Sequence, residues 1–349
     1  MMGAGEPRVA PRERTWARVM EGDGDETSRG LSPFREIPVA DYQSREGGRI
    51  RCGLCPHACL MRDGERGRCR VRLALDGRLL AEGYGVISSM ALDPIEKKPL
   101  ARYKPGTRVL SVGGYGCNLS CSFCQNHEIS QRGVPRALER GSTGYLSPAE
   151  RGSSAGFHSA AGPVSPSDLV DEASSLAARG NIGLAFTYNE PFINHEFAFD
   201  CAYLARERGL DVVLVTNGFV NLEPLMDILP LVSAMNIDLK AFTEGFYRSV
   251  CGGSLEPVKE TIRLAHEACH VELTTLVIPG LNSSASEIEA LASWIESVSP
   301  DIPLHLTRHH PSYRMREPEP IGVDGLLSLA RVASSRLSTV IPGNIPLFS

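Results

Sequence analysis

The feature that most constrains the fold is an alternation of short apolar strands and helical segments, which starts at Arg108 and continues nearly to the last residue. Six apolar segments have the composition of strands: Val109–Val112, Ile182–Thr187, Val212–Thr216, Met235–Leu239, Val271–Ile278 and Pro303–Thr307. Helical segments lie between and after them: Ser167–Arg179, Pro191–Arg208, Leu222–Leu229, Leu255–Cys269, Ala285–Ser297 and Asp324–Ser335. Such alternation predicts parallel βαβ units, and six units predict an α/β fold built as a partial TIM-type (β/α)6 barrel. A doubly wound open sheet is the competing prediction, but the first strand leads into Gly113-Gly114-Tyr115-Gly116 and not into the Gly-x-Gly-x-x-Gly of that fold.

Three cysteines with the spacing C-x3-C-x2-C follow this first strand directly: Cys117, Cys121 and Cys124. Three thiolates on one short loop can reach three corners of a cubane iron–sulfur cluster, which normally takes four cysteines. The fourth iron then keeps an open coordination position, which is the property that separates catalytic from structural metal sites. We expect the preceding glycines to be needed because a Cβ there would crowd the sulfurs. The alternative is a three-cysteine zinc site completed by His127.

Polar residues also follow the second and third predicted strands. Glu190 lies in Thr187-Tyr188-Asn189-Glu190-Pro191, where its carboxylate is placed to accept a hydrogen bond from an ammonium group. Thr216 and Asn217 offer a hydroxyl and an amide that suit a ribose or a carboxylate. The carboxyl ends of barrel strands form the active site in this fold class, so these groups are predicted to meet there. Ordinary β-to-α turns are the alternative for both segments.

The fourth and sixth predicted strands end in charged or titratable residues. Asp238 and Lys240 share one face of a strand, because strand side chains alternate, and they form a charged pair that suits a zwitterionic ligand. A solvent-exposed ion pair is the alternative. Arg308-His309-His310 ends the sixth strand, and of its two histidines His310 is the candidate for ligand binding.

The cysteine loop resembles that of the radical S-adenosylmethionine (SAM) superfamily, in which an aromatic residue, here Phe123, precedes the third cysteine. The longer string Gly116–Ser130 is similar to one branch, the radical enzymes of the AmmeMemoRadiSam system, which are related to pyruvate formate-lyase activating enzymes. The resemblance extends from about Arg51 to Leu347 and includes Asp93–Leu100 and Thr307–Met315.

This resemblance implies a [4Fe–4S] cluster on Cys117, Cys121 and Cys124, whose open iron binds the amino and carboxylate groups of SAM. An electron from a donor such as flavodoxin or ferredoxin then cleaves SAM, and the resulting 5′-deoxyadenosyl radical abstracts hydrogen from an unknown protein or small-molecule substrate. From the strand ends and the resemblance together, the residues predicted to bind SAM are Tyr188, Asn189, Glu190, Thr216, Asn217, Asp238, Lys240 and His310. The chain departs from its relatives at Tyr188-Asn189, where they have Gly-Gly, and at Val215, where they often have Asp.

Two other functions stay open at this point. One is an activating enzyme that generates a glycyl radical on a partner protein, and the other is a zinc-binding adaptor without catalysis. The polar strand ends at Glu190, Asp238 and Lys240 favour an enzyme, because an adaptor does not need a polar barrel mouth.

A second group of cysteines, Cys52, Cys55, Cys59 and Cys69, has the spacing C-x2-C-x3-C-x9-C. Four thiolates suit a structural zinc ion or a second iron–sulfur cluster equally well, and unligated thiols are the alternative. Relatives often carry a further Cys-Pro-x-Cys after a Gly-Asn dipeptide, whereas this chain has Gly343-Asn344 without it. Residues 46–105 contain little apolar sequence, so we expect a Cys-rich N-terminal module held together by metal.

The remaining boundaries follow from composition. Residues 1–45 are polar and lack periodicity, which predicts a disordered leader, and residues 106–349 form the barrel domain with a flexible insertion at about 135–166. A net charge of −5 argues against a nucleic-acid partner, and no apolar run is long enough to cross a membrane. Met1–Ala10 lacks the apolar core of a signal peptide, and the chain has ten cysteines, so we expect metal ligation and a cytoplasmic location.

Overall fold

The computed structural model describes residues 13–20, 34–135 and 163–345, and its central element is an eight-stranded sheet. The strands of this sheet are β8 (Ser89–Pro94), β9 (Arg108–Gly113), β10 (Asn181–Phe186), β11 (Asp211–Thr216), β12 (Ala234–Asp238), β13 (His270–Val277), β14 (Leu304–Arg308) and β15 (Val340–Gly343). Neighbours in the sheet follow the order of the chain, and every pair is parallel except the antiparallel pair β8–β9. The α/β fold of the partial TIM type is therefore confirmed. Strands β8 and β15 extend it beyond the six units that the periodicity predicts.

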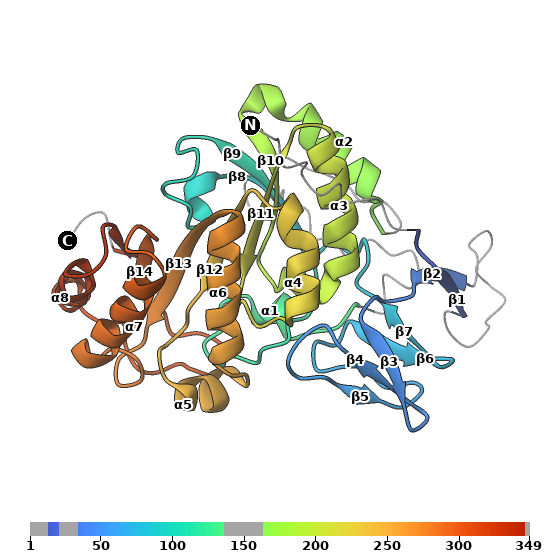
Figure 1. The fold of residues 1–349 in the computed structure, drawn as a ribbon, viewed down its shortest axis with the longest axis horizontal. Coiled ribbons are helices and arrows are strands. Elements are labelled where there is room, and N and C mark those ends of the chain that lie inside the picture. Colours follow the sequence, from blue (N-terminus) through green and yellow to red (C-terminus); the bar gives the residue numbers. More distant parts are fainter. Residues whose placement is uncertain (1–12, 21–33, 136–162, 346–349) are drawn as a thin grey trace, which may run out of the picture.

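Helices lie between the parallel strands, and the longer ones cover the outer face of the sheet (Figure 1). They are α1 (His127–Ser130), α2 (Pro166–Ser175), α3 (His195–Glu207), α4 (Leu222–Ile228), α5 (Glu244–Phe246), α6 (Glu256–Ala268), α7 (Ala285–Val298) and α8 (Val323–Ser334). Serine caps begin two of them: Ser165 Oγ accepts a hydrogen bond from the Asp168 N–H, and Ser284 Oγ accepts one from the Glu287 N–H, each at 3.1 Å. The predicted helix Pro191–Arg208 divides into a 3-10 turn over Pro191–Asn194 followed by α3.

One end of the barrel is closed by the segment that joins β8 to β9. The Glu272 carboxylate on β13 is fully buried and accepts hydrogen bonds from the backbone N–H groups of Ala101 at 3.0 Å and Arg102 at 2.7 Å. Asn236 on β12 donates from Nδ2 to the carbonyl oxygen of Pro99 at 2.9 Å. Since residues 99–102 pack against inward-facing side chains at this end, the open mouth lies at the carboxyl ends of the strands.

Three small sheets form the N-terminal region, which lies to one side of the barrel (Figure 1). Their strands are β1 (Trp16–Met20) with β2 (Phe34–Pro38), then β3 (Gln43–Glu46), β4 (Arg49–Cys52) and β5 (Leu60–Met61), and finally β6 (Arg72–Leu75) with β7 (Arg78–Ala81). A buried ion pair joins this region to α3, because Arg72 donates two hydrogen bonds to Glu196, at 2.8 and 2.7 Å. The strand β8, by contrast, belongs to the central sheet, so the N-terminal module ends before Ser89 and not at 105.

The prediction of a disordered leader over residues 1–45 is wrong for the part that the structure describes. Strand β1 pairs with β2, and Arg14 forms ion pairs with Asp41 at 2.8 Å and with Asp200 of α3 at 2.7 Å. Only 6% of the Arg14 side chain is exposed. The pairing of Arg14 with Asp200 joins residues far apart in the sequence, so a local pattern does not reveal it.

Residues 136–162 of the predicted insertion lie outside the described residues. Its last residues belong to the fold: Val164 is buried and Ser165 caps α2. Within the described parts of the chain, none of the helices combines the length and the apolar composition needed to cross a membrane.

Candidate functional site

A cavity of about 460 Å³ opens at the carboxyl ends of the strands. It is lined by three cysteines, by the ends of β10, β11 and β12, and by residues of the closing segment and of β13 and β14. Ten of the residues singled out in the sequence border it: Cys117, Cys121, Cys124, Tyr188, Asn189, Glu190, Thr216, Asn217, Asp238 and Lys240. The volume is within the range of small-molecule sites, which is about 300–1,000 Å³.

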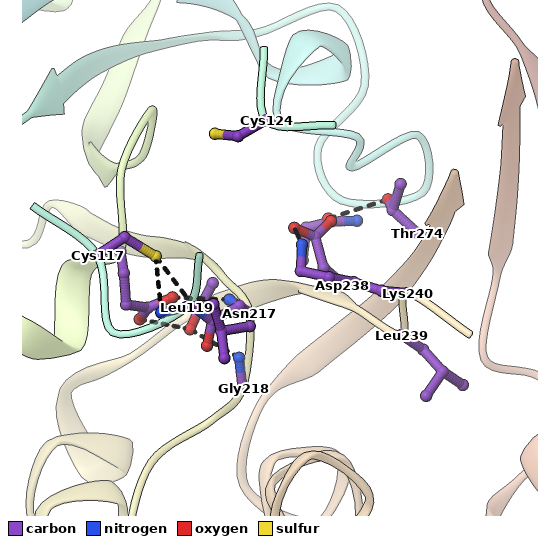
Figure 2. A network of polar contacts seen from close by, with 12 residues as sticks. Cys117, Leu119, Cys124, Asn217, Gly218, Asp238, Leu239, Lys240 and Thr274 are labelled. Carbon is purple, nitrogen blue, oxygen red and sulfur yellow. Dashed lines mark hydrogen bonds and ion pairs between the residues drawn. The ribbon is translucent and has the colours of Figure 1, made fainter. Parts of the chain in front are cut away.

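Polar groups of the protein contact the three cysteine sulfurs. Cys117 Sγ accepts hydrogen bonds from the Leu119 N–H at 3.4 Å and from Asn217 Nδ2 at 3.5 Å. Cys124 Sγ lies 3.1 Å from the hydroxyl of Ser130, and Cys121 shares a hydrogen bond with the thiol of Cys251. Figure 2 shows the sulfurs of Cys117 and Cys124 pointing into the space that separates them from Asp238.

The protonation of these thiols follows from the same surroundings. Burial raises the pKa of Cys117 and of Cys124, whereas the hydrogen bond from Cys251 lowers the pKa of Cys121. Metal ligation displaces thiol protons, and three thiols on one loop are the donor set that a cubane cluster with one open iron requires. Since all three line one cavity with room beside them, the residues present fit such a cluster together with a small ligand.

His127 does not take part in this set. Its ring stacks on Tyr313 with 4.5 Å between ring centroids, and its Nδ1 lies 3.3 Å from the carbonyl oxygen of Cys124. The ring of His127, the residue that would complete a three-cysteine zinc site, is thus held by Tyr313 and by the backbone of Cys124.

The glycine before the first cysteine is required for a different reason from the one expected. Gly116 has φ +83°, and a Cβ there would lie 2.2 Å from the carbonyl oxygen of Cys69. The N-terminal module, and not the sulfurs, therefore excludes a side chain at this position.

The carboxylate of Glu190 is held by three donors. Its Oε1 accepts from Thr216 Oγ1 at 2.7 Å and from the Phe192 N–H at 3.0 Å, and its Oε2 accepts from the Asn217 N–H at 2.8 Å. Only 2% of the residue is exposed, and this burial raises its pKa to about 7 despite the three donors. An ionised carboxylate accepts about four hydrogen bonds, so one further donor can be accommodated.

The amides of Asn189 and Asn217 are engaged within the protein. Asn189 accepts from the Gly114 N–H at 2.9 Å and donates to the carbonyl oxygen of Gly116 at 3.1 Å, which holds the turn before the cysteine loop. Asn217 donates from Nδ2 to Asn118 Oδ1 at 2.9 Å, in addition to its bond to Cys117. Both asparagines thus orient the loop that carries the cysteines.

Asp238 and Lys240 form the predicted pair, with 2.8 Å between Lys240 Nζ and Asp238 Oδ2 (Figure 2). Burial works against the ammonium form, but Asp238 and the nearby Cys121 and Cys251 outweigh it and raise the pKa of Lys240. The pair borders the cavity on the side opposite Cys117 and supplies one charge of each sign.

Two lysines at the cavity were missed by the sequence reasoning. Lys98, 2% exposed, donates to Asp93 at 2.8 Å, and its ammonium lies 4.6 Å from the centre of the Tyr188 ring. Lys97 borders the cavity beside it. The chain has only five lysines, and two of them adjoin here, which is the signal that would have pointed to this segment.

The structure places His310 away from the site. It is exposed and does not border the cavity, whereas the neighbouring His309 is fully buried. Since the peptide turns after β14, the two rings face different surroundings.

The four N-terminal cysteines lie around a second, enclosed cavity of about 20 Å³ behind the cysteine loop. All four thiols line it, together with His57 and Arg72. In residues 13–20, 34–135 and 163–345, no three histidine, cysteine, aspartate or glutamate side chains stand in an arrangement that would hold a metal ion.

Comparison with known proteins agrees with this geometry. The profile of the radical SAM superfamily matches residues 111–295. An uncharacterized protein of Methanocaldococcus jannaschii is 36% identical over 309 residues, which is 87% of this chain and 84% of that protein. The isethionate sulfite-lyase activating enzyme of Oleidesulfovibrio alaskensis is 29% identical over 36% of this chain, a match that spans 41% of that enzyme.

Among solved structures, a domain of pyruvate-formate lyase-activating enzyme from Bacteroides vulgatus is similar with a TM-score of 0.41 and 20% identity, over 46% of this chain and 98% of that one. Streptococcus suis SuiB bound to S-adenosylmethionine is similar with a TM-score of 0.49 and 10% identity, over 67% of this chain and 49% of that one. The profile covers more than half of the chain, and the archaeal relative covers most of it. The chain belongs to the radical SAM superfamily.

Proposed function

We propose that this protein is an enzyme in which Cys117, Cys121 and Cys124 hold a [4Fe–4S] cluster and the adjoining cavity binds SAM. The observation that carries the proposal is that the three thiols and the polar ends of β10, β11 and β12 line one cavity of about 460 Å³. When bound, the cluster would supply the electron that cleaves SAM, and the radical so formed would take a hydrogen atom from the substrate.

In this proposal Glu190 receives the amino group of SAM. Glu190 borders the cavity, and an N–H donor of the amino group favours the ionised state that burial disfavours. Asp238 and Lys240 present opposite charges to the other charged groups of the cofactor. Tyr188 offers a ring to its nucleoside, and Val215 and Leu276 supply apolar surface that excludes water.

The substrate is a protein or a small molecule, and the electron donor is a flavodoxin or ferredoxin type of protein. An activating enzyme that generates a glycyl radical on a partner protein is the second candidate, because the isethionate sulfite-lyase relatives are named activating enzymes. The matches to these relatives span less than half of their own length.

The direct experiment measures SAM cleavage. The protein is reconstituted anaerobically with iron and sulfide, reduced with dithionite and incubated with SAM, and 5′-deoxyadenosine and methionine are quantified by mass spectrometry. We expect both products in equal amounts, and we expect Cys117→Ala, Cys121→Ala and Cys124→Ala each to lose the visible absorbance of the cluster and the products.

Cys269→Ser is the matched control, because Cys269 is at the end of α6 and outside the cavity. A single cluster variant that keeps full iron and full cleavage contradicts the ligand assignment. A colourless wild-type protein that binds stoichiometric zinc favours the adaptor. Electron paramagnetic resonance of candidate partner proteins after the reaction separates the activating enzyme from an enzyme with a small substrate.

A further inference from the structure

The N-terminal cysteines form a group that the reaction at the barrel mouth does not use. Cys52 ends β4, Cys55 and Cys59 lie in the following loop, and Cys69 precedes β6, yet all four thiols line one enclosed cavity. Its volume of about 20 Å³ exceeds the roughly 10–15 Å³ that one water molecule needs, and it is far smaller than the cavity at the barrel mouth. The space therefore suits a single ion.

Burial governs the protonation of these cysteines. It raises the pKa of Cys52, raises that of Cys55 to about 12 and raises that of Cys69 to about 11, and the nearby backbone N–H groups oppose this effect only in part. The three groups are therefore thiols in the free protein, and a metal ion that binds them must displace their protons.

Two backbone turns hold the thiols in this arrangement. The Ala58 N–H donates to the carbonyl oxygen of Cys55 at 3.0 Å, and the Arg70 N–H donates to that of Gly67 at 2.9 Å. Ala58 and Arg70 have φ +44° and +68°, a left-handed conformation that non-glycine residues rarely adopt. Such strain persists only where the surroundings enforce it, and here each strained residue adjoins a cysteine of the group.

Positive charge adjoins the same cavity. Arg68 and Arg72 both border it, and Arg72 is also paired with Glu196. Four thiolates on a divalent ion carry a net charge of −2, which these cations offset in part. The region has short strands, so an added cross-link would contribute to its folding.

We propose that Cys52, Cys55, Cys59 and Cys69 bind one divalent metal ion, zinc or iron, through four thiolates. The ion enters as M²⁺, and the thiols release their protons to solvent as it binds, so no electron is transferred. The four cysteines line the cavity but, like the other candidate ligands in the described residues, do not stand at coordinating positions in this structure, so binding requires their side chains to turn toward its centre. A closed four-thiolate set has no open position, so the ion is structural.

This ion would brace the catalytic loop. His57 Nε2 lies 2.8 Å from the carbonyl oxygen of Asn118, and Asn118 borders the same cavity as the four cysteines. Asn118 follows Cys117 directly, so a fixed module holds the first cluster cysteine in place.

The experiment uses the full chain with Cys117, Cys121 and Cys124 all changed to Ala, which removes the proposed cluster. We expect about one zinc or iron per chain by elemental analysis, without acid-labile sulfide. Adding Cys52→Ser and Cys55→Ser should lower this content at least tenfold, whereas adding Cys269→Ser should leave it unchanged. Failure of SAM cleavage does not affect this result, because the starting variant lacks the cluster cysteines.

A second measurement keeps the test valid if the serine variant does not fold. The triple Ala variant is stripped with a chelator, its circular dichroism is compared with that of the untreated variant, and Co²⁺ is added. A tetrahedral thiolate site should give thiolate-to-cobalt charge transfer and visible bands that saturate at one Co²⁺ per chain. Absence of metal and of a cobalt spectrum overturns the proposal, and so does metal content that survives the Cys52/Cys55 change. Several irons with labile sulfide overturn the single-ion site.

Discussion

The hydroxyl of Thr216 donates a 2.7 Å hydrogen bond to the carboxylate of Glu190, and this bond joins the ends of β10 and β11 beside the cavity. Glu190 is therefore oriented before any ligand arrives. Its carboxylate is desolvated, borders the cavity and has three of about four acceptor positions filled, so it can accept one hydrogen bond from an amino group.

Glu190→Gln should weaken SAM binding about ten- to a hundredfold, because a hydrogen bond between charged partners contributes about 1.5–3 kcal/mol. Isothermal titration calorimetry under anaerobic conditions measures the affinity, and iron content should stay unchanged. Glu289→Gln, outside the cavity, is the matched control. If both variants bind SAM with the same affinity, Glu190 does not bind SAM and only stabilises the turn after β10.

The same affinity should depend on pH. Burial raises the pKa of Glu190 to about 7, so the free protein holds this group protonated below that pH and ionised above it. The ionised carboxylate keeps an acceptor position for the amino group of SAM, whereas the protonated form has less acceptor capacity. Affinity for SAM should therefore fall about tenfold from pH 8 to pH 6, since the ionised fraction falls tenfold per pH step below the pKa. Glu190→Gln should remove this dependence, and a dependence that survives in the variant would assign it to another group.

Ser130→Ala should make the proposed cluster harder to reduce. The Ser130 hydroxyl lies 3.1 Å from Cys124 Sγ, and hydrogen bonds to cluster sulfurs stabilise the reduced, more negative state. A tenfold drop in the one-electron equilibrium constant corresponds to about 59 mV. A redox titration followed by electron paramagnetic resonance measures the potential, with Ser297→Ala on α7 as control. An unchanged potential at full iron content would show that this contact does not affect the cluster.

Arg72→Met should destabilise the fold by about 3–5 kcal/mol, because it leaves the Glu196 carboxylate buried without its partner. Both side chains are at most 1% exposed. Urea unfolding followed by circular dichroism gives the free energy. Arg248→Met breaks the exposed pair with Glu244 and should cost about 0.3–0.5 kcal/mol. If both variants lose a similar amount of unfolding free energy, burial does not make the Arg72–Glu196 pair more important for stability than the exposed pair.

Glu272→Gln should lower the free energy of unfolding at neutral pH, and this loss should become smaller at acid pH. Burial alone would raise the pKa of Glu272, but His270, His305 and two backbone N–H groups lower it from 4.5 to about 2. A carboxyl group whose pKa is lowered on folding stabilises the protein above its unfolded pKa, and this contribution disappears as pH falls toward the folded pKa. The difference in unfolding free energy between wild type and variant should shrink between pH 4.5 and pH 2. A constant difference, with exposed Glu260→Gln as reference, would contradict the assignment.

The fold and the centre of the site could be read from local patterns. The six predicted strands agree with β9–β14 to within one residue at each end, because parallel strands covered on both faces are continuous apolar runs. The sequence also predicted that several groups at the strand ends lie close together, because the strand ends of a barrel converge at one mouth. These groups are the cluster cysteines, Glu190, Thr216, Asp238 and Lys240, and all of them line the cavity.

Other features depended on contacts between distant segments. Strand β8 carries no helix that would mark a βαβ unit, and Arg14 joins the leader to α3 across 186 residues. The placement of Lys97 and Lys98 beside the cavity follows from the segment that closes the barrel, which the sequence pattern does not describe.

The sequence by itself determined which chemistry the chain can carry, because cysteine spacing and strand-end carboxylates are properties of neighbouring residues. Only the tertiary structure decided how each group is used. Asn189 and Asn217 hold the cysteine loop, His309 and not His310 is buried, and Gly116 makes room for the N-terminal module. These assignments depend on which distant atoms fill the space around a side chain, and packing of that kind is set only when the whole chain has folded.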